Sequence, residues 1–465
     1  MLKFLPLDDK SIKKIQKYTK NSSYRVCDIS AGVLYMWNDI FNVSYSVYNK
    51  TLILKSNFKN SFSAFFMPVG VDVDGALKQI EVYAQKTHTP LKFMCVEEKW
   101  LEFLKSRYND NIKSEYNRDF SDYLYDYQSL KTLVGKKFSG QRNHINGFKK
   151  LYPNYKFKKL TAKHKDKIMA FLKEYKKEHV GGNRIEKAEF KNTLKLVNNL
   201  NLLNFVGGYM EIDKKMCSFT IGEYVGETLI IHIEKALKNY KGIYPATFNE
   251  FLKASEKEGV TLINREDDSG DLGLRTSKTQ YQPIELLHKH FVSVNPPFNV
   301  RAYPYLKGKK IILNKITESD KKDYYKLYVN KSLNKYWGYD YKKDIKNPTI
   351  DSFYELQKND FKAKDNMCLA IRKSKNSNLI GEIVLHNFTY DGEVEIGVRL
   401  FKKYHNQTLG TDALKTAINY VVKTLKKRPI AKCYLKNLSS LKSLQNSGFI
   451  VKNEDKKFYY LEFLS

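Results

Sequence analysis

Four acidic side chains gather in one short stretch of a strongly basic chain. The chain carries 81 Lys and Arg against 50 Asp and Glu, which gives a formal net charge of +31. Residues 263–275 read INREDDSGDLGLR, and the acids there are Glu266, Asp267, Asp268 and Asp271. Carboxylates at this density could bind a metal ion, hold a positively charged substrate group, or face solvent in a turn.

The spacing of these acids argues against a calcium loop. An EF-hand loop has acids at positions 1, 3 and 5, Gly at position 6 and Glu at position 12. If Gly270 is at position 6, then Arg265 is at position 1, Ser269 at position 5 and Thr276 at position 12. The sequence therefore predicts no metal here, and it leaves the ammonium pocket and the solvated turn as the two interpretations.

A basic segment, residues 131–167, has the opposite charge. It contains twelve Lys and Arg and one acid, a net charge of +11. Ile145 and Phe148 would form the apolar side of a helix, so that Arg142 and Lys149 face outward. Cations interleaved with aromatic rings suit RNA phosphates and unpaired bases. The predicted tRNA-binding residues are Lys136, Lys137, Arg142, His144, Lys149 and Lys150. A solvated lysine-rich helix is the alternative.

The cysteines and the hydropathy pattern predict a reducing compartment. The five cysteines are widely spaced and form no CxxC pair, which argues against disulfides and a thiolate zinc site. The start of the chain has no apolar run of the signal-peptide kind. No window approaches the roughly 18 apolar residues of a membrane span. We therefore predict a cytoplasmic protein without a transmembrane segment, with peripheral membrane contact left open.

Three segments of the chain repeat one order of elements. In each, antiparallel strands lead into a loop, a helix and a further strand, with the helices expected at residues 73–87, 245–259 and 412–427. A proline-containing stretch, residues 292–308, separates the last copy. We predict an α+β fold of three similar modules, each a mostly antiparallel sheet flanked by helices. The predicted boundaries are 1–130, 131–292, a linker at 293–303, and 304–465.

The loop before the helix expected at 412–427 predicts a phosphate site, because a strand there leads into a helix start that contains a glycine. It reads YHNQTLGTDAL, and NLSSLKSLQNSGF follows at 437–449. On these stretches residues 304–465 resemble a GNAT N-acetyltransferase of the ribosomal-protein-acetylating type. The family pattern is Q/R-x-x-G-x-G/A, and His405 and Thr408 depart from it.

That resemblance implies acetyl transfer from acetyl-CoA to an amine. Glu395 is the candidate base on the strand before the loop. The implied cofactor-binding residues are Val398, Gln407, Leu409, Gly410, Thr411, Asn437 and Ser440.

A second resemblance covers about residues 1–292. The stretches 122–148, 219–223, 232–251 and 262–283 are similar to the catalytic C-terminal domain of the phosphatidylglycerol lysyltransferase family. This implies a tandem pair of GNAT-like halves, with aminoacyl-tRNA as the donor. The loop before the middle helix has a single glycine, Gly242, which makes coenzyme A a poor donor for this unit.

The site implied for this unit contains an acid on a strand and the acidic stretch. Glu234 is the lead catalytic acid. The implied substrate or amine-binding residues are Glu266, Asp267, Asp268, Arg275, Lys278 and Tyr281. Carboxylates beside a cationic surface would suit the ammonium of an aminoacyl group.

The prediction is thus an acyltransferase of three GNAT-like modules, with no metal cofactor. Two alternatives stay open. In one, acetyl-CoA is the only donor and the N-terminal pair recruits the substrate. In the other, the chain is a non-catalytic RNA- or ribosome-binding protein. The acceptor, the amino acid and the oligomeric state are not fixed by the sequence.

Overall fold

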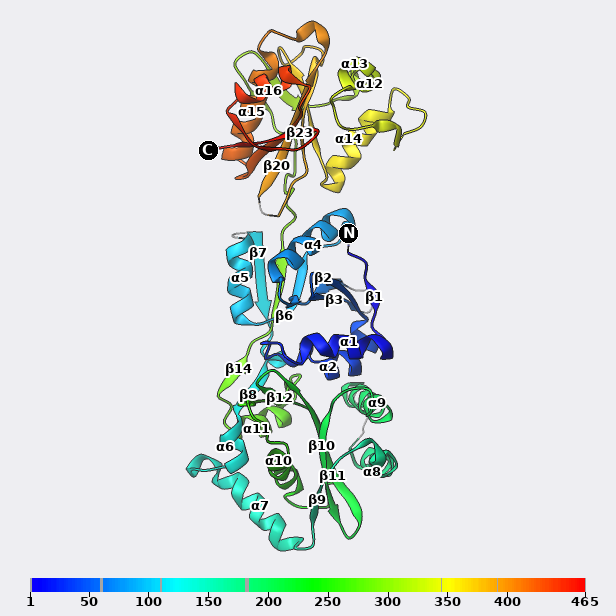
Figure 1. The fold of residues 1–465 in the computed structure, drawn as a ribbon, viewed down its shortest axis with the longest axis vertical. Coiled ribbons are helices and arrows are strands. Elements are labelled where there is room, and N and C mark those ends of the chain that lie inside the picture. The colour runs from blue at the N-terminus through cyan, green and yellow to red at the C-terminus, as the bar shows by residue number, and fades with distance from the viewer. Residues whose placement is uncertain are drawn as a thin grey trace. The chain divides into compact units, whose positions relative to one another are not determined.

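The computed structural model describes residues 2–58, 62–108, 111–179, 184–343, 345–390 and 392–464. The chain forms two compact units, Met1–Val294 and Asn295–Ser465 (Figure 1). The units contain three mostly antiparallel sheets flanked by helices, which confirms the predicted mixed α/β fold class. Within the described ranges, no helix is both long and apolar enough to cross a membrane.

The first sheet and its helices come mainly from the N-terminal part of unit 1. Its strand order is β1 (Leu5–Pro6), β2 (Val43–Tyr48), β3 (Thr51–Phe58), β4 (Phe62–Phe65), β6 (Lys92–Val96), β15 (His290–Val294) and β7 (Ile112–Tyr116), with β5 (Val69–Gly70) paired to β3. Its helices are α1 (Asp9–Thr19), α2 (Ala31–Met36), α3 (Asn38–Phe41), α4 (Val73–Lys86) and α5 (Glu98–Tyr108).

The second sheet is covered on both faces. Its strand order is β14 (Glu285–Leu287), β8 (Asp122–Asp126), β13 (Leu262–Asn264), β12 (Thr228–Ala236), β11 (Lys215–Val225), β10 (Val206–Ile212) and β9 (Lys156–Lys159). Its helices are α6 (Tyr127–Thr132), α7 (Ser139–Leu151), α8 (Lys165–His179), α9 (Arg184–Asn198), α10 (Ile243–Ala254) and α11 (Leu272–Thr279). Helices α8 and α9 bury apolar side chains on one face, whereas α6, α7 and α10 do so on the other (Figure 1).

The third sheet forms unit 2. Its strand order is β16 (Leu306–Lys307), β17 (Ile312–Lys315), β18 (Met367–Arg372), β19 (Gly381–His386), β20 (Glu393–Leu400), β21 (Arg428–Tyr434), β23 (Phe458–Phe463) and β22 (Phe449–Glu454). Its helices are α12 (Lys321–Val329), α13 (Lys331–Asn334), α14 (Ser352–Ala363), α15 (Leu409–Lys423) and α16 (Leu438–Gln445).

The first two sheets exchange strands along the chain. Strand β8 precedes residue 130 but pairs with β13 and β14 of the second sheet. Strand β15 follows the whole second sheet but pairs with β6 and β7 of the first. Because each sheet contains a strand from the part of the chain that forms most of the other sheet, the two modules form one unit.

Each sheet contains one parallel strand pair that is short. In the second sheet β12 and β13 pair from Thr228/Leu262 to Ile230/Asn264, and β12 then runs on to Ala236. In the third sheet β20 and β21 pair only as far as Glu395/Ile430, and β20 runs on to Leu400. The parallel partners therefore separate, and α10 and α15 begin just after this separation.

More than half of helix α10 is buried, and the helix begins at a glycine that the packing requires. Gly242, its N-cap, has φ +81°, and a Cβ there would lie 2.6 Å from the carbonyl oxygen of His144 on α7. Only glycine accepts this conformation together with so close a backbone neighbour. Helix α7 thus packs directly on the loop that leads into α10.

Candidate active sites

The acidic stretch begins where β13 ends, beside the separated end of β12. Glu266 has φ +59°, a left-handed conformation that is uncommon for a residue other than glycine. Its N–H donates to Asn264 Oδ1 at 2.6 Å, and its carbonyl oxygen accepts from the N–H of Tyr123 at 3.2 Å. The buried ammonium of Lys278 donates to the carbonyl oxygens of Arg265, at 2.7 Å, and Asp267. The backbone of residues 265–267 is therefore held by hydrogen bonds with Tyr123, Asn264 and Lys278.

Lys278 was predicted to contact substrate, but its ammonium is used inside the protein. Burial, and then the charge of Arg265, lower the pKa of Lys278. A lysine that donates to backbone carbonyls in this way shapes the loop rather than presenting a charge to solvent.

Each predicted acid of the stretch has a cationic partner within the protein. Glu266 Oε1 lies 2.8 Å from His232 Nδ1. Asp267 Oδ2 lies 3.2 Å from the ammonium of Lys289. The three carboxylates are 25%, 21% and 0% exposed for Glu266, Asp267 and Asp268 in turn, so these acids do not lie in a solvated turn, whereas residues 269–274 are exposed.

Asp268 is the most enclosed of these acids. Arg275 donates to both of its oxygens, at 3.0 and 2.9 Å, and Arg118 donates to Oδ2. Tyr123 donates its hydroxyl to the same Oδ2 at 2.6 Å. Burial opposes the charge on Asp268, but these hydrogen bonds outweigh it and hold the pKa well below its ordinary value. The structure thus uses the buried Asp268 and the partly exposed Arg275 together as an ion pair.

Glu234, the predicted catalytic acid, lies on β12 beyond the point where β13 leaves it. Arg265 donates to Glu234 Oε2 from Nε at 3.0 Å and from a terminal nitrogen at 2.7 Å. The guanidinium lies 4.5 Å from the ring centroid of Phe248 and 4.7 Å from that of Tyr281. Tyr281 is therefore brought to the predicted site, where it contacts Arg265.

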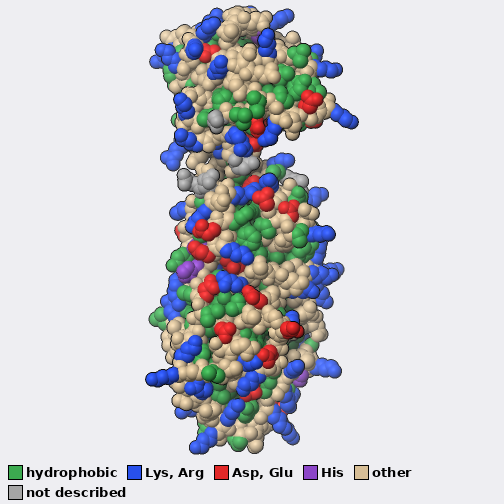
Figure 2. Space-filling view, turned by 60° about the vertical axis from the view of Figure 1, so that its left-hand side comes forward, with side chains coloured by type: hydrophobic (Ala, Val, Ile, Leu, Met, Phe, Trp, Pro, Cys, Tyr) green, Lys and Arg blue, Asp and Glu red, His purple; other side chains and the backbone are tan. Residues whose placement is uncertain are grey.

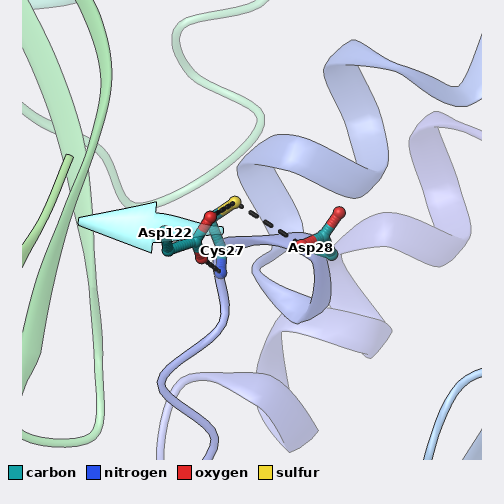
Figure 3. Close-up of side chains that lie close together, drawn as sticks. All are labelled: Cys27, Asp28 and Asp122. Atoms are coloured by element: carbon teal, nitrogen blue, oxygen red, sulfur yellow. Dashed lines mark hydrogen bonds between the residues drawn. The ribbon is translucent and has the colours of Figure 1, made fainter. Parts of the chain in front are cut away.

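A cluster of possible metal ligands lies between the two modules of unit 1. The thiol of Cys27 points between the carboxylates of Asp28 and Asp122 (Figure 3), and the ligand atoms lie within 4.8 Å of one another. Lys289 Nζ lies 2.8 Å from Asp28 and 2.9 Å from Asp122. Burial raises the pKa of the Cys27 thiol, which disfavours the thiolate that metals bind. The cation of this cluster is Lys289, and we assign no metal site to it.

Two residues of the site were missed by sequence reasoning. His232 and Glu223 are buried, and His232 Nε2 lies 3.1 Å from Glu223 Oε1. Glu223 Oε1 also accepts the N–H of Gly32, on α2, at 2.6 Å. Both residues fall within the stretches that carry the family resemblance. An ionisable residue within an otherwise apolar strand is the sequence signal that could have identified them.

The predicted tRNA-binding residues fall into two groups. Arg142 and Lys149 line a groove of about 440 Å³ between α6, α7 and α10, together with Lys131 and Lys253. Two acids lie close by: Glu256, 2.5 Å from Lys131, and Glu250, 3.3 Å from Lys149. The other four predicted residues are exposed but do not line the groove: Lys136, Lys137, His144 and Lys150.

Positive charge is not confined to this segment. Figure 2 shows Lys and Arg side chains scattered over the visible face of both units, whereas most visible Asp and Glu lie on unit 1. The groove is therefore distinguished by several cations around one hollow rather than by the sign of its charge.

In unit 2, Glu395 is the last residue of the parallel pairing between β20 and β21. Asn387 donates to Glu395 Oε2 at 2.8 Å. His386 is directly opposite Glu395 on β19, with 3.9 Å between Nε2 and Oε1, and burial lowers the pKa of His386. The predicted base thus lies at the separation of the strands, beside a histidine.

The predicted phosphate loop leads into α15. Thr408 is the N-cap, with φ +60°, so Leu409, Gly410 and Thr411 form the first turn, whose N–H groups have no acceptor within a helix. A Cβ on Gly410 would meet only Leu400 Cδ1, at 3.4 Å. Gln407 donates its side chain to the carbonyl oxygen of Lys403 at 2.9 Å.

The remaining predicted cofactor residues lie nearby in the fold. Val398 is on β20 beyond the separation, opposite Ile383 of β19. Asn437 is the N-cap of α16 and accepts the N–H of Ser440 at 3.4 Å. Asn437 and Ser440 therefore form the N-terminal cap of α16.

Comparison with known proteins agrees with both resemblances. Residues 20–292 match the family described as phosphatidylglycerol lysyltransferase, C-terminal, and residues 310–450 match an acetyltransferase (GNAT) domain. An uncharacterized protein of Mycoplasmoides gallisepticum is 26% identical over 199 residues, 42% of this chain. The match spans 62% of the length of that relative.

Two solved structures align with a little over 60% of this chain. A conserved protein of unknown function from Bacteroides thetaiotaomicron aligns with a TM-score of 0.60 at 28% identity, over 63% of this chain and 100% of that one. The L-PGS structure from Bacillus licheniformis aligns with a TM-score of 0.44 at 13% identity, over 62% of this chain and 92% of that one. With the family match covering more than half of its residues, the chain belongs to the phosphatidylglycerol lysyltransferase C-terminal family, and a match to a GNAT acetyltransferase domain follows that family region.

Proposed function

We propose that unit 1 transfers an aminoacyl group from aminoacyl-tRNA to an acceptor, and that unit 2 transfers an acetyl group from acetyl-CoA to an amine. The observation that carries the first part is the position of α10 between the cationic groove and the ion pair of Arg265 with Glu234. Phe248 of α10 contacts Arg265, which pairs with Glu234, while the next residue, Asn249, lines the cationic groove. Donor phosphates in the groove would therefore lie about one helix diameter, roughly 10 Å, from the separated strands.

The packing around α10 supports a donor other than coenzyme A for unit 1. A pyrophosphate cradle needs an open helix N-terminus with free N–H groups. Gly242, the N-cap of α10, is covered by α7, with His144 O 2.6 Å and Phe148 Cβ 3.1 Å from its would-be Cβ. In unit 2 the first turn of α15 is more open, since a Cβ on Gly410 would meet only Leu400 Cδ1, at 3.4 Å.

Two carboxylates are proposed to contact the ammonium of the aminoacyl group. Glu234 and Asp267 are about one-fifth exposed, and each has an internal cation partner, Arg265 or Lys289, with which a substrate ammonium would share it. Asp268, whose two oxygens are both occupied, is proposed to hold α11 in place instead.

For unit 2 the separation at Glu395 supports direct acyl transfer. Beyond Glu395 the edge of β20 is no longer paired with β21, so a strand N–H near Val398 would be placed to stabilise an oxyanion. Glu395 would take the proton of the attacking amine. The first turn of α15 would hold the pyrophosphate.

The deciding experiment follows two labels separately. The full chain is incubated with cell extract and either bulk tRNA charged with radiolabelled amino acids or radiolabelled acetyl-CoA. We expect label to leave the tRNA and appear on a non-tRNA product, and acetyl label to appear on an amine. Label that stays on the tRNA overturns the first activity, and acetyl label that stays on coenzyme A overturns the second.

A further inference from the structure

We propose that Glu266 is the proton acceptor of aminoacyl transfer in unit 1, and that His232 and Glu223 are buried positioning residues that hold it. This inference rests on the function proposed for unit 1 and names the residue that moves the proton. The sequence prediction named Glu234 as the lead catalytic acid and placed Glu266 among the amine-binding residues.

The three side chains form a continuous series from the surface to the interior. Glu266 Oε1 is 2.8 Å from His232 Nδ1, and His232 Nε2 is 3.1 Å from Glu223 Oε1. The side chains of Glu266, His232 and Glu223 are 25%, 0% and 2% exposed. Only the outer end of the series can meet a substrate, and the buried end is fixed by the N–H of Gly32.

The partner of Glu266 sets it apart from the neighbouring acids of the site. Glu234 is paired with a guanidinium, Asp267 with an ammonium and Asp268 with two guanidinium groups. Such cations keep their charge at neutral pH and hold a carboxylate ionised. An imidazole shares its proton with a carboxylate on either side, so Glu266 can gain and lose a proton without leaving an unpaired charge.

The local backbone also marks this position. His232 is the extra residue of a β-bulge, since Gly222 pairs with Ile231 and Ile221 with Ile233. Bulges commonly redirect a side chain beside an active site. Glu266 is in a left-handed conformation and its backbone N–H and carbonyl take part in three hydrogen bonds; such outliers gather at functional sites. Both features lie where β12 and β13 separate.

The electrostatics support the assignment. Burial raises the pKa of Glu266, which makes it a stronger base than a solvated glutamate. Burial alone would lower the pKa of His232, but the hydrogen bonds to Glu223 and Glu266 outweigh it and raise the pKa to about 9. The other ionisable groups that face the series are Cys27, Asp267 and Lys278.

The proposed step balances without a further reactant. The acceptor nitrogen or oxygen bonds to the carbonyl carbon of the aminoacyl ester, and its proton moves to Glu266. The ester bond to the terminal ribose of the tRNA breaks, and Glu266 returns the proton to that ribose oxygen. The products are the aminoacylated acceptor and tRNA with a free hydroxyl.

The first test compares two acid-to-amide variants in the same stretch, using bulk charged tRNA and cell extract as the acceptor source. Glu266→Gln should slow transfer by about 10²–10⁴-fold with tRNA binding retained. The matched control is Asp271→Asn, because Asp271 caps α11 through Leu274 N–H and asparagine caps equally well. Transfer by Glu266→Gln at the wild-type rate would overturn the inference and leave the proposed function standing. Absence of transfer by the wild-type chain would remove the proposed function itself.

A second test separates positioning from folding. Glu223→Gln keeps an oxygen for Gly32 N–H but removes the charge that raises the pKa of His232. In a nitrogen-15 histidine titration, the His232 signal should move from about 9 toward the ordinary histidine pKa of about 6.5. The pH profile of transfer should shift with it. A shifted titration with an unmoved transfer profile would contradict a positioning role for His232 and Glu223.

Discussion

Arg265 gives two hydrogen bonds to a single oxygen of Glu234, while the rings of Phe248 and Tyr281 lie against its guanidinium. Burial opposes the charge on Arg265, yet the charge of Glu234 outweighs it and raises the pKa of Arg265. The acid that the sequence nominated for catalysis is therefore half of a largely buried ion pair.

Removing Glu234 should cost stability as well as activity. Glu234→Gln leaves the buried Arg265 without its counter-charge, which should lower the free energy of unfolding by about 3 kcal/mol. Urea unfolding measures this, and the double variant with Arg265→Gln should recover part of the loss. A loss below about 0.5 kcal/mol would mean that water replaces the carboxylate.

The cationic groove should contribute to tRNA binding through phosphate contacts. Lys149→Ala and Lys253→Ala should each reduce the slope of log K against log salt by about 1. The matched control is Lys10→Ala, an exposed lysine on α1. If the slope of log K against log salt is equal for all three variants, the groove lysines do not contact phosphates and the alternative of a solvated lysine-rich helix is favoured.

Asp268 should make the protein sensitive to acid. Its folded-state pKa is depressed, so its contribution is present at neutral pH and is lost as the pH falls below the ordinary Asp pKa of about 3.9. Asp268→Asn should unfold more easily at neutral pH, by about 3 kcal/mol, and should lose less stability on acidification. Urea unfolding at several pH values checks both, and parallel curves for the two proteins would contradict the prediction.

Gly32 should not accept a side chain. A Cβ there would lie 2.4 Å from His232 Nε2 and 2.9 Å from Glu223 Oε1. Gly32→Ala must displace one of them and should destabilise unit 1 by about 1–3 kcal/mol. Gly140→Ala, in α7 with nothing within 4 Å, should be neutral or stabilising by up to about 1 kcal/mol. Thermal unfolding compares the two, and equal melting temperatures would refute the tight contact.

Gly410 variants should separate folding from cofactor binding in unit 2. In Gly410→Ala the added Cβ would contact only Leu400, at an ordinary van der Waals distance, so the affinity for acetyl-CoA should change little. Gly410→Glu adds a negative charge in the first turn of α15, which favours the helix but repels a pyrophosphate. Calorimetry with the full chain should show weaker acetyl-CoA binding at an unchanged melting temperature. Equal affinity in both variants would place the pyrophosphate elsewhere.

Much of the fold followed from local signals. The helices expected at 73–87, 245–259 and 412–427 are found at Val73–Lys86, Ile243–Ala254 and Leu409–Lys423. Periodicity and turn residues specify such elements because they depend on neighbours within a few positions. The family assignment came instead from the resemblance of long stretches, such as residues 262–283, to a known family.

The tertiary structure alone decided how charges are paired. Glu266 pairs with His232, 34 positions away, and Asp268 with Arg118, 150 positions away. It also decided that β8 and β15 cross between the first two sheets. Sequence patterns give the sign of a charge and the face of a strand, but a hydrogen bond between distant residues depends on packing. The acidic stretch is for that reason not a single carboxylate cluster, because Glu266, Asp267 and Asp268 each pair with a different cationic side chain.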